Sequence, residues 1–100
     1  MKSLGLSVHV TELDVIDADL PPEVSSRDAM VAARAHDFLA AVFAGARPEV
    51  IATWGITDRY TWMPMWFKRS DGLPNRPLPL DRDYQRKPLW TVVDYFCQKE

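Results

Sequence analysis

The stretch Val8-His9-Val10-Thr11-Glu12-Leu13-Asp14-Val15 joins a strand-like apolar run to two carboxylates at its end. Apolar side chains at alternate positions from Leu6 to Val10 are typical of a buried β-strand. The same alternation predicts that Glu12 and Asp14 share one face where the strand ends, and that His9 points to the other face. Carboxylates at the C-terminal end of a parallel strand are typical of barrel enzymes. The alternative interpretation is an exposed acidic pair without a function.

A helix is predicted after this strand. Ser25 and Ser26 follow a Pro-Pro pair, as N-cap residues do, and Gly45 is the predicted C-terminal stop. Apolar residues recur along the segment at spacings of three and four, which is the pattern of one buried helix face. They are Val31, Ala35, Phe38, Leu39 and Val42. His36, on the same segment, is interpreted as an ordinary helix residue, because a lone histidine on a helix is more often a surface or hydrogen-bonded residue than a ligand.

A second strand is predicted from Val50 to Trp54, followed by a long proline-containing segment without periodicity. A loop of that length in a compact domain is usually functional or disordered, and its aromatic residues favour an ordered, ligand-facing loop. Within it, 58–60 (Asp-Arg-Tyr) are predicted to order the loop. A closing helix is predicted to begin at Pro88, with an apolar stripe of Leu89, Val92, Val93 and Phe96. This order predicts an α/β fold with a parallel strand pair and a right-handed crossover.

Composition excludes several classes of protein. A hydrophobic content of 47% indicates a folded chain, and a net charge of -2 without a basic stripe argues against nucleic acid as a partner. The sequence contains no apolar run of the roughly 20 residues that a membrane span needs, and no export signal is visible after Met1. Cys97 is the only cysteine, so neither an internal disulfide nor a cysteine-based metal site is expected.

Three motifs occur in a specific order: T-E-L-D at 11–14, T-W-G-I-T-D-R-Y-T-W at 53–62, and D-Y-Q-R-K-P at 83–88. Together they resemble the last part of the catalytic domain of glycoside hydrolase family 10, the endo-1,4-β-xylanases. The resemblance covers nearly all of residues 1–100. It implies the C-terminal quarter of a (β/α)₈ TIM barrel, with the last two strands and helices. A complete barrel has about 250 residues, so an N-terminal barrel portion needed for activity is expected to be missing before Met1.

The resemblance also implies roles for individual residues. Glu12 matches the nucleophile of a retaining enzyme that hydrolyses β-1,4-xylosidic bonds in xylan, and Asp14 matches a residue that orients a histidine from an earlier strand. Trp54 and Trp62 match the two tryptophans that enclose the reacting sugar. Without the resemblance, a structural role for both rings is the more common one. Trp66 is predicted to extend this surface and Trp90 to pack in the closing helix.

No complete catalytic pair is predicted. In the family the acid/base glutamate follows an asparagine, whereas Glu23, Glu49 and Glu100 do not. No cofactor or metal is expected. The chain alone is therefore expected to be inactive, and the full-length enzyme is expected to be extracellular or periplasmic. The alternative is a non-catalytic remnant that binds carbohydrate or another partner, and a small structural protein with accidental resemblance is a third interpretation.

Overall fold

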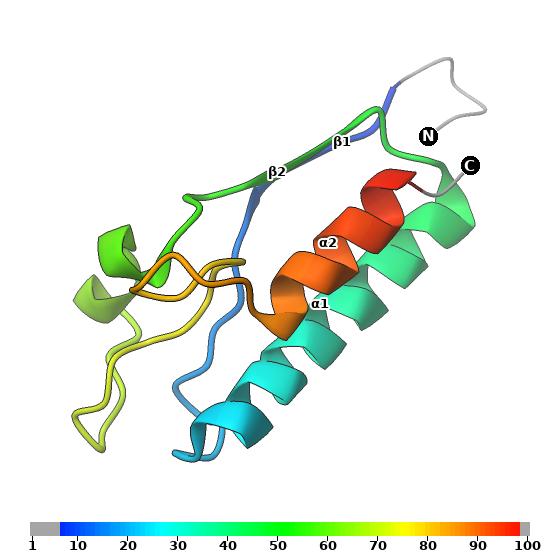
Figure 1. Cartoon of the computed structure of the whole chain (residues 1–100). Helices are drawn as coiled ribbons and strands as arrows, with labels where there is room; N and C mark the ends of the chain where they lie inside the picture. Colours follow the sequence, from blue (N-terminus) through cyan, green and yellow to red (C-terminus); the bar gives the residue numbers. More distant parts are fainter. Residues whose placement is uncertain (1–6, 99–100) are drawn as a thin grey trace.

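The computed structural model describes residues 7–98, and the predicted order of elements is confirmed (Figure 1). The elements are β1 (His9–Leu13), α1 (Val24–Gly45), β2 (Val50–Thr53), the 3-10 turns η2 (Asp58–Tyr60) and η3 (Met63–Met65), and α2 (Pro88–Gln98). The part of the β1 alternation that falls on Leu6 lies outside the described residues.

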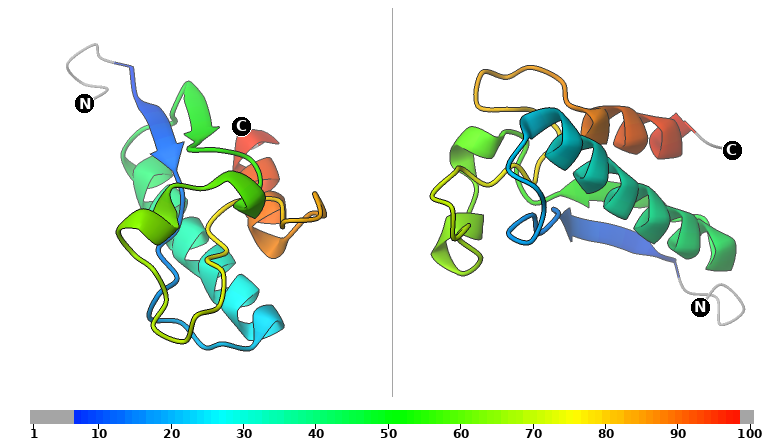
Figure 2. Two further views of the ribbon diagram at one scale, coloured as in Figure 1. Left: turned by 90° about the vertical axis from the view of Figure 1, so that its left-hand side faces the viewer. Right: turned by 90° about the horizontal axis from the view of Figure 1, so that it is seen from below.

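The two strands form a small parallel sheet, with His9 opposite Val50 and Val10 opposite Ile51. Both helices lie on the same side of this sheet and pack against each other (Figures 1 and 2). Since only two strands pair within residues 7–98, each strand has one edge without a strand partner in that range. The fold is therefore one layer of helices on one face of an open parallel sheet.

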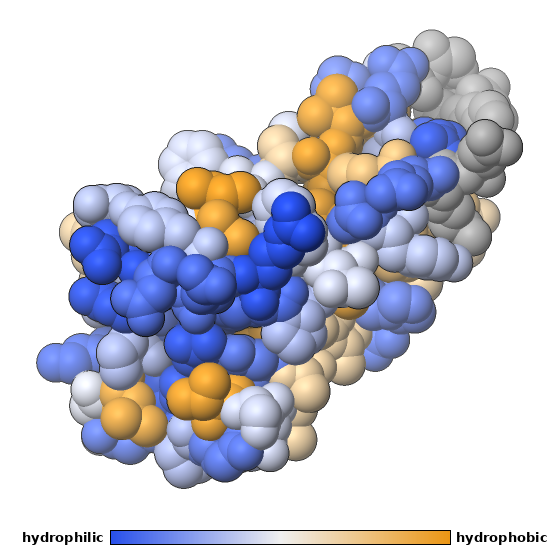
Figure 3. All heavy atoms as spheres, viewed as in Figure 1, coloured by the Kyte–Doolittle hydropathy of each residue, from blue (hydrophilic) through white to orange (hydrophobic). Residues whose placement is uncertain are grey.

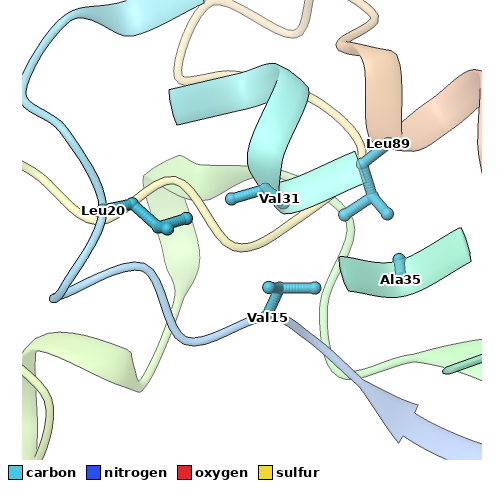
Figure 4. Packing of buried hydrophobic residues seen from close by; sticks show 5 residues of the cluster. All are labelled: Val15, Leu20, Val31, Ala35 and Leu89. Atoms are coloured by element: carbon cyan, nitrogen blue, oxygen red, sulfur yellow. The ribbon is translucent and has the colours of Figure 1, made fainter. Parts of the chain in front are cut away.

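The core lies between the sheet and the helices. Figure 4 shows one cluster at the base of α1, made by Val15, Leu20, Val31, Ala35 and Leu89. A second cluster contains Val10, Leu13, Leu39 and Phe96. The predicted stripe of α2 is confirmed, because all four of its residues belong to these clusters or pack on them. In α1 the prediction is wrong at Phe38, which is 50% exposed, because the buried positions repeat every fourth residue.

The start of α1 differs from the prediction. The N-cap is Glu23, whose carboxylate accepts the backbone N–H of Ser26 at 2.6 Å and the hydroxyl of Ser25. A glutamate reaches the orphan N–H groups of the first turn as a shorter capping side chain does, so the serines become helical residues. Gly45 closes the helix as its last residue, and Ala46 is the C-cap.

A β-bulge in β1 changes which side chains share a face. The register with β2 is interrupted between Val10 and Leu13, and both of these residues are buried although they are three positions apart. Glu12 has a φ of 58°, the left-handed region that L-residues other than glycine seldom adopt. Strict alternation from Val10 would have buried Glu12 against the helices. The bulge shifts the alternation by one, so that Glu12 is exposed.

His9 is exposed, as are Thr11 and Glu12, and its orientation away from the Glu12 face stays a prediction. It lies outside the site, because it is near the start of β1 and its Nε2 is 3.6 Å from the carboxylate of Glu49. His36, the other histidine, is exposed and lies with its ring 5.3 Å from that of Phe96.

Buried polar contacts hold the long loop between β2 and α2. Asp17, which is fully buried, accepts the side-chain N–H of Asn75 and the backbone N–H of Arg76, both at 2.7 Å. Asp58 accepts the backbone N–H of Leu78 at 2.9 Å and the ammonium of Lys87 at 2.6 Å. These bonds join the loop to the turn after β1 and to the start of α2, so the loop is ordered by this chain itself.

The predicted ordering role of 58–60 is confirmed for two of its residues. Asp58 is 2% exposed and bonded as described above. Arg59 donates from Nε to the carbonyl of Arg82 at 2.9 Å, and its guanidinium lies 5.5 Å from the ring centre of Tyr84. Both residues contact the later part of the loop, which leads to α2, and so connect the two ends of the loop.

Candidate active site

The four predicted site residues lie together where the two strands end. Trp54 directly follows β2, and its backbone N–H donates to the carbonyl of Leu13, the residue between Glu12 and Asp14, at 3.0 Å. Trp62 reaches the same point from the loop, since its Nε1–H donates to Oδ2 of Asp14 at 2.6 Å. The parallel arrangement brings both strand ends to one edge, as predicted.

Asp14 is half-buried beside an exposed carboxylate. Its burial raises the pKa of Asp14 above the usual value, the hydrogen bond from Trp62 lowers it, and the negative charge of Glu12 raises it again. The net direction is upward. Among the described residues the structure shows no contact of Asp14 with a histidine, so the histidine role implied by the resemblance stays a prediction.

The aromatic side chains differ in how firmly they are held. The ring of Trp62 meets that of Phe67 edge-on at 5.7 Å, whereas Trp54 is 51% exposed. Trp66 is 75% exposed at the end of η3, which suits a surface ring. Trp90 has the guanidinium of Arg86 over its ring at 4.8 Å, and it packs in α2 as predicted.

A carboxylate at a strand end beside flat aromatic rings suits a saccharide. Pyranose rings offer apolar C–H faces to aromatic side chains, and their hydroxyls bind polar groups. No second glutamate joins Glu12 within residues 7–98, because Glu23 caps α1 and Glu49 lies beside His9. Glu100 lies outside the described residues. In the same range no group of three or more His, Cys, Asp or Glu side chains is arranged to hold a metal ion.

Two apolar hollows lie at the site, and one of them is lined in part by Glu12 and Asp14. One of about 420 Å³ is lined by residues 10–16 of the first strand segment and by Arg34, Ala35 and Phe38 of α1. The other, of about 190 Å³, lies between the end of β2 and α2, where Figure 3 shows apolar atoms at the surface. Neither contains Trp54 or Trp62. Both lie along the strand edges that have no partner in the described chain.

Sequence reasoning missed the residues that hold the loop around the site. Asp17, Asn75 and Lys87 are at most 4% exposed and make the buried bonds described above. The only signal for Asp17 was its place shortly after the strand. The hydrogen-bond partners of its carboxylate are 58 and 59 residues away in the sequence, beyond any periodic pattern.

Neither α1 nor α2, the two α-helices of the described chain, has the length and hydropathy that a membrane span requires.

A parallel strand pair joined by a helix and covered by one helical layer is the arrangement of a segment of a (β/α) barrel. Its residues 1–95 match the model of glycosyl hydrolase family 10, and the chain belongs to that family.

Individual proteins that the chain resembles agree with this family assignment. It is 33% identical over 96 residues to endo-1,4-beta-xylanase 1 of Humicola insolens, covering 91% of this chain and 20% of that protein. Xylanase 10B of Thermotoga petrophila, solved with xylobiose, aligns with a TM-score of 0.70 and 24% identity, over 95% of this chain and 28% of that one. Xylanase10C of Cellvibrio japonicus (mutant E385A), solved with xylopentaose, aligns with a TM-score of 0.74 and 23% identity. The alignment covers 99% of this chain and 23% of that one.

The chain thus spans about a fifth of the length of the curated relative and about a quarter of the solved barrels. At these identities the solved structures show the fold alone. The α/β architecture is therefore that of a segment of a family 10 barrel.

Proposed function

We propose that this chain is the C-terminal quarter of the barrel of a retaining endo-1,4-β-xylanase, and that Glu12 is its nucleophile. The observation that carries the proposal is the bulge in β1, where Glu12 is exposed beside the strand end that Trp54 and Trp62 both reach. Family membership supports xylan as the substrate, and the relatives solved with xylobiose and xylopentaose support binding of xylo-oligosaccharides.

In this mechanism the Glu12 carboxylate attacks the anomeric carbon of a xylosyl unit. The bond from that carbon to the leaving oxygen breaks, and a covalent glycosyl-enzyme ester forms. Water then attacks the same carbon from the other side and releases the carboxylate, which leaves the configuration unchanged overall. A second carboxyl group, about 5 to 5.5 Å away, protonates the leaving oxygen and then deprotonates the water. The remaining barrel would supply that group and cover the two apolar hollows.

A chimeric barrel tests the proposal. It is xylanase 10B of Thermotoga petrophila in which the part matched by this chain, 28% of that enzyme, is replaced by residues 1–100. We expect the purified 100-residue chain to release no sugar from xylan, because it lacks the general acid, and the chimeric barrel to cleave xylan. The measurement is reducing-sugar release. Cleavage by the chain alone, lost in Glu12→Gln, would contradict this expectation and show that copies assemble into a working site.

The two tryptophans give a second prediction in the chimeric barrel. Trp62→Ala should raise KM for xylo-oligosaccharides on the order of tenfold, since a stacking ring contributes roughly 1 to 1.5 kcal/mol. We expect Trp54→Ala to lower the melting temperature more, because Trp54 adjoins the sheet and Trp62 lies farther out on the loop. Thermal unfolding and initial rates measure both effects, with Trp66→Ala as a matched change of an exposed ring. Equal losses of melting temperature would favour a structural role for Trp62.

A non-catalytic carbohydrate-binding remnant is the second candidate. The observation in its favour is that two tryptophans but a single glutamate reach the strand ends within the described chain. The two candidates differ in the chimeric barrel. A remnant would bind xylotriose without restoring cleavage, whereas the segment of an enzyme restores it.

A further inference from the structure

The bond between Asp14 and Trp62 joins two parts of the site that are 48 residues apart in the sequence. Oδ2 of Asp14 accepts the indole N–H of Trp62 at 2.6 Å, and the ring of Phe67 lies nearly perpendicular to the indole, with the ring centres 5.7 Å apart. Trp62 is thus held at its nitrogen from the end of β1, and it packs against another ring of its own loop. No other side-chain hydrogen bond of Trp62 is formed among residues 7–98.

This bond fixes the direction in which the ring faces. The indole N–H lies in the plane of the ring, so a carboxylate fixed at a strand end restricts rotation of that plane. The bond is short, as expected for a donor that meets an ionised acceptor. Trp54 has no such bond, since its indole has no hydrogen-bond partner in the described chain. Of the two rings at the strand ends, only Trp62 is therefore held by a charge.

We propose that Asp14 is a positioning residue that holds the indole of Trp62 as a preset stacking face for the sugar next to Glu12. The proposal rests on the sugar-binding function proposed above. It gives Asp14 a role on the substrate side of the site, which is separate from the histidine role implied by the resemblance. A preset ring loses less conformational entropy when the sugar binds, which is how preorganisation strengthens binding.

The same arrangement makes Trp62 sensitive to the charge of Glu12. Burial raises the pKa of Asp14, the bond from Trp62 lowers it, and the Glu12 carboxylate, two residues away, raises it further. When Glu12 becomes an ester in the covalent intermediate, its negative charge is lost. The pKa of Asp14 then falls, and Asp14 remains ionised at a lower pH than before. The acceptor that holds Trp62 is then more firmly charged while the sugar is attached.

Nitrogen-15 NMR of the four indole groups tests the first step in the 100-residue chain, with Trp62→Phe to assign the Trp62 resonance. We expect the Trp62 N–H to exchange with water on the order of tenfold more slowly than that of Trp54. The protection should remain in Asp14→Asn, which keeps an oxygen acceptor, and be lost in Asp14→Leu. In Glu12→Gln, the pH at which the Trp62 resonance titrates should fall. Equal exchange of both indoles in the unchanged chain would overturn the proposal.

Xylotriose binding tests the second step, with Trp62→Phe as the matched background because it keeps a flat ring and lacks the N–H. Asp14→Leu should weaken binding about tenfold when Trp62 is present and little when position 62 is phenylalanine. Equal weakening in both backgrounds would overturn the positioning role and leave sugar binding at Trp62 intact. These measurements are made in the chimeric barrel, and absence of xylotriose binding by a folded chimera with a protected Trp62 N–H would overturn the proposed function, and this role with it.

Discussion

In the chimeric barrel we expect Glu12→Gln to lower kcat for xylan cleavage by several orders of magnitude while the melting temperature stays nearly unchanged. The amide is almost isosteric with the carboxylate but is a far weaker nucleophile. Because the Glu12 side chain is exposed, its replacement removes no packing. The measurement is steady-state kinetics with xylan, together with thermal unfolding of the same preparation.

A matched variant separates a nucleophile from a carboxylate that only orients the substrate. In Glu12→Gly, added azide can enter the space of the lost side chain and attack the anomeric carbon of a substrate with an activated leaving group. A single attack inverts that carbon, so the product should be an α-xylosyl azide. Retention of most activity in Glu12→Gln, or no azide product in Glu12→Gly, would show that another carboxylate is the nucleophile.

The largest effect on stability is expected for Asp58→Ala. Asp58 and Lys87 form a fully enclosed ion pair at 2.6 Å, with side chains 0% and 2% exposed. Removing the carboxylate leaves the Lys87 ammonium buried without a counter-charge and the N–H of Leu78 without its acceptor, which costs about 3 to 5 kcal/mol. The expected result is a large fall in the urea concentration at the unfolding midpoint. Unfolding is monitored by the circular dichroism of the helices.

Two controls show whether the pair itself is responsible. Asp58→Leu combined with Lys87→Met replaces both charges by apolar groups and should recover part of the loss, since such replacements are often neutral. Asp19→Ala removes the exposed pair with Arg34, at 2.7 Å, and should cost less than about 1 kcal/mol. Equal effects of Asp58→Ala and Asp19→Ala would contradict the role of the buried pair.

Local patterns predicted most of the elements. The stripe of α2 and the inward residues of α1 follow from helical periodicity, and β1 and β2 follow from short β-branched runs bounded by polar residues. Phe38 was misplaced because a stripe with spacings of both three and four residues is wider than the face that the sheet and α2 cover. The cap at Glu23 was missed because its longer side chain reaches the same N–H as a serine would.

The parts of the site that depend on pairing between distant segments were not predictable in this way. Alternation placed Glu12 and Asp14 at the strand end, but the bulge that exposes Glu12 arises in the register with β2. The bond from Trp62 to Asp14 and the contacts of Asp17 with Asn75 and Arg76 each join residues about fifty positions apart or more. No motif within one segment records such contacts. The resemblance named Asp14 and Trp62 but not the bond between them.

The left-handed backbone at Glu12 has a consequence for engineering. An L-residue with a side chain at φ 58° costs about 1 to 2 kcal/mol, and glycine is free of that cost. Since the Glu12 side chain is exposed, a selection for heat resistance alone would favour glycine at this position and would discard the proposed nucleophile. Directed evolution of this segment therefore needs a screen for turnover at every round, because in this strand thermal tolerance and chemistry select different residues.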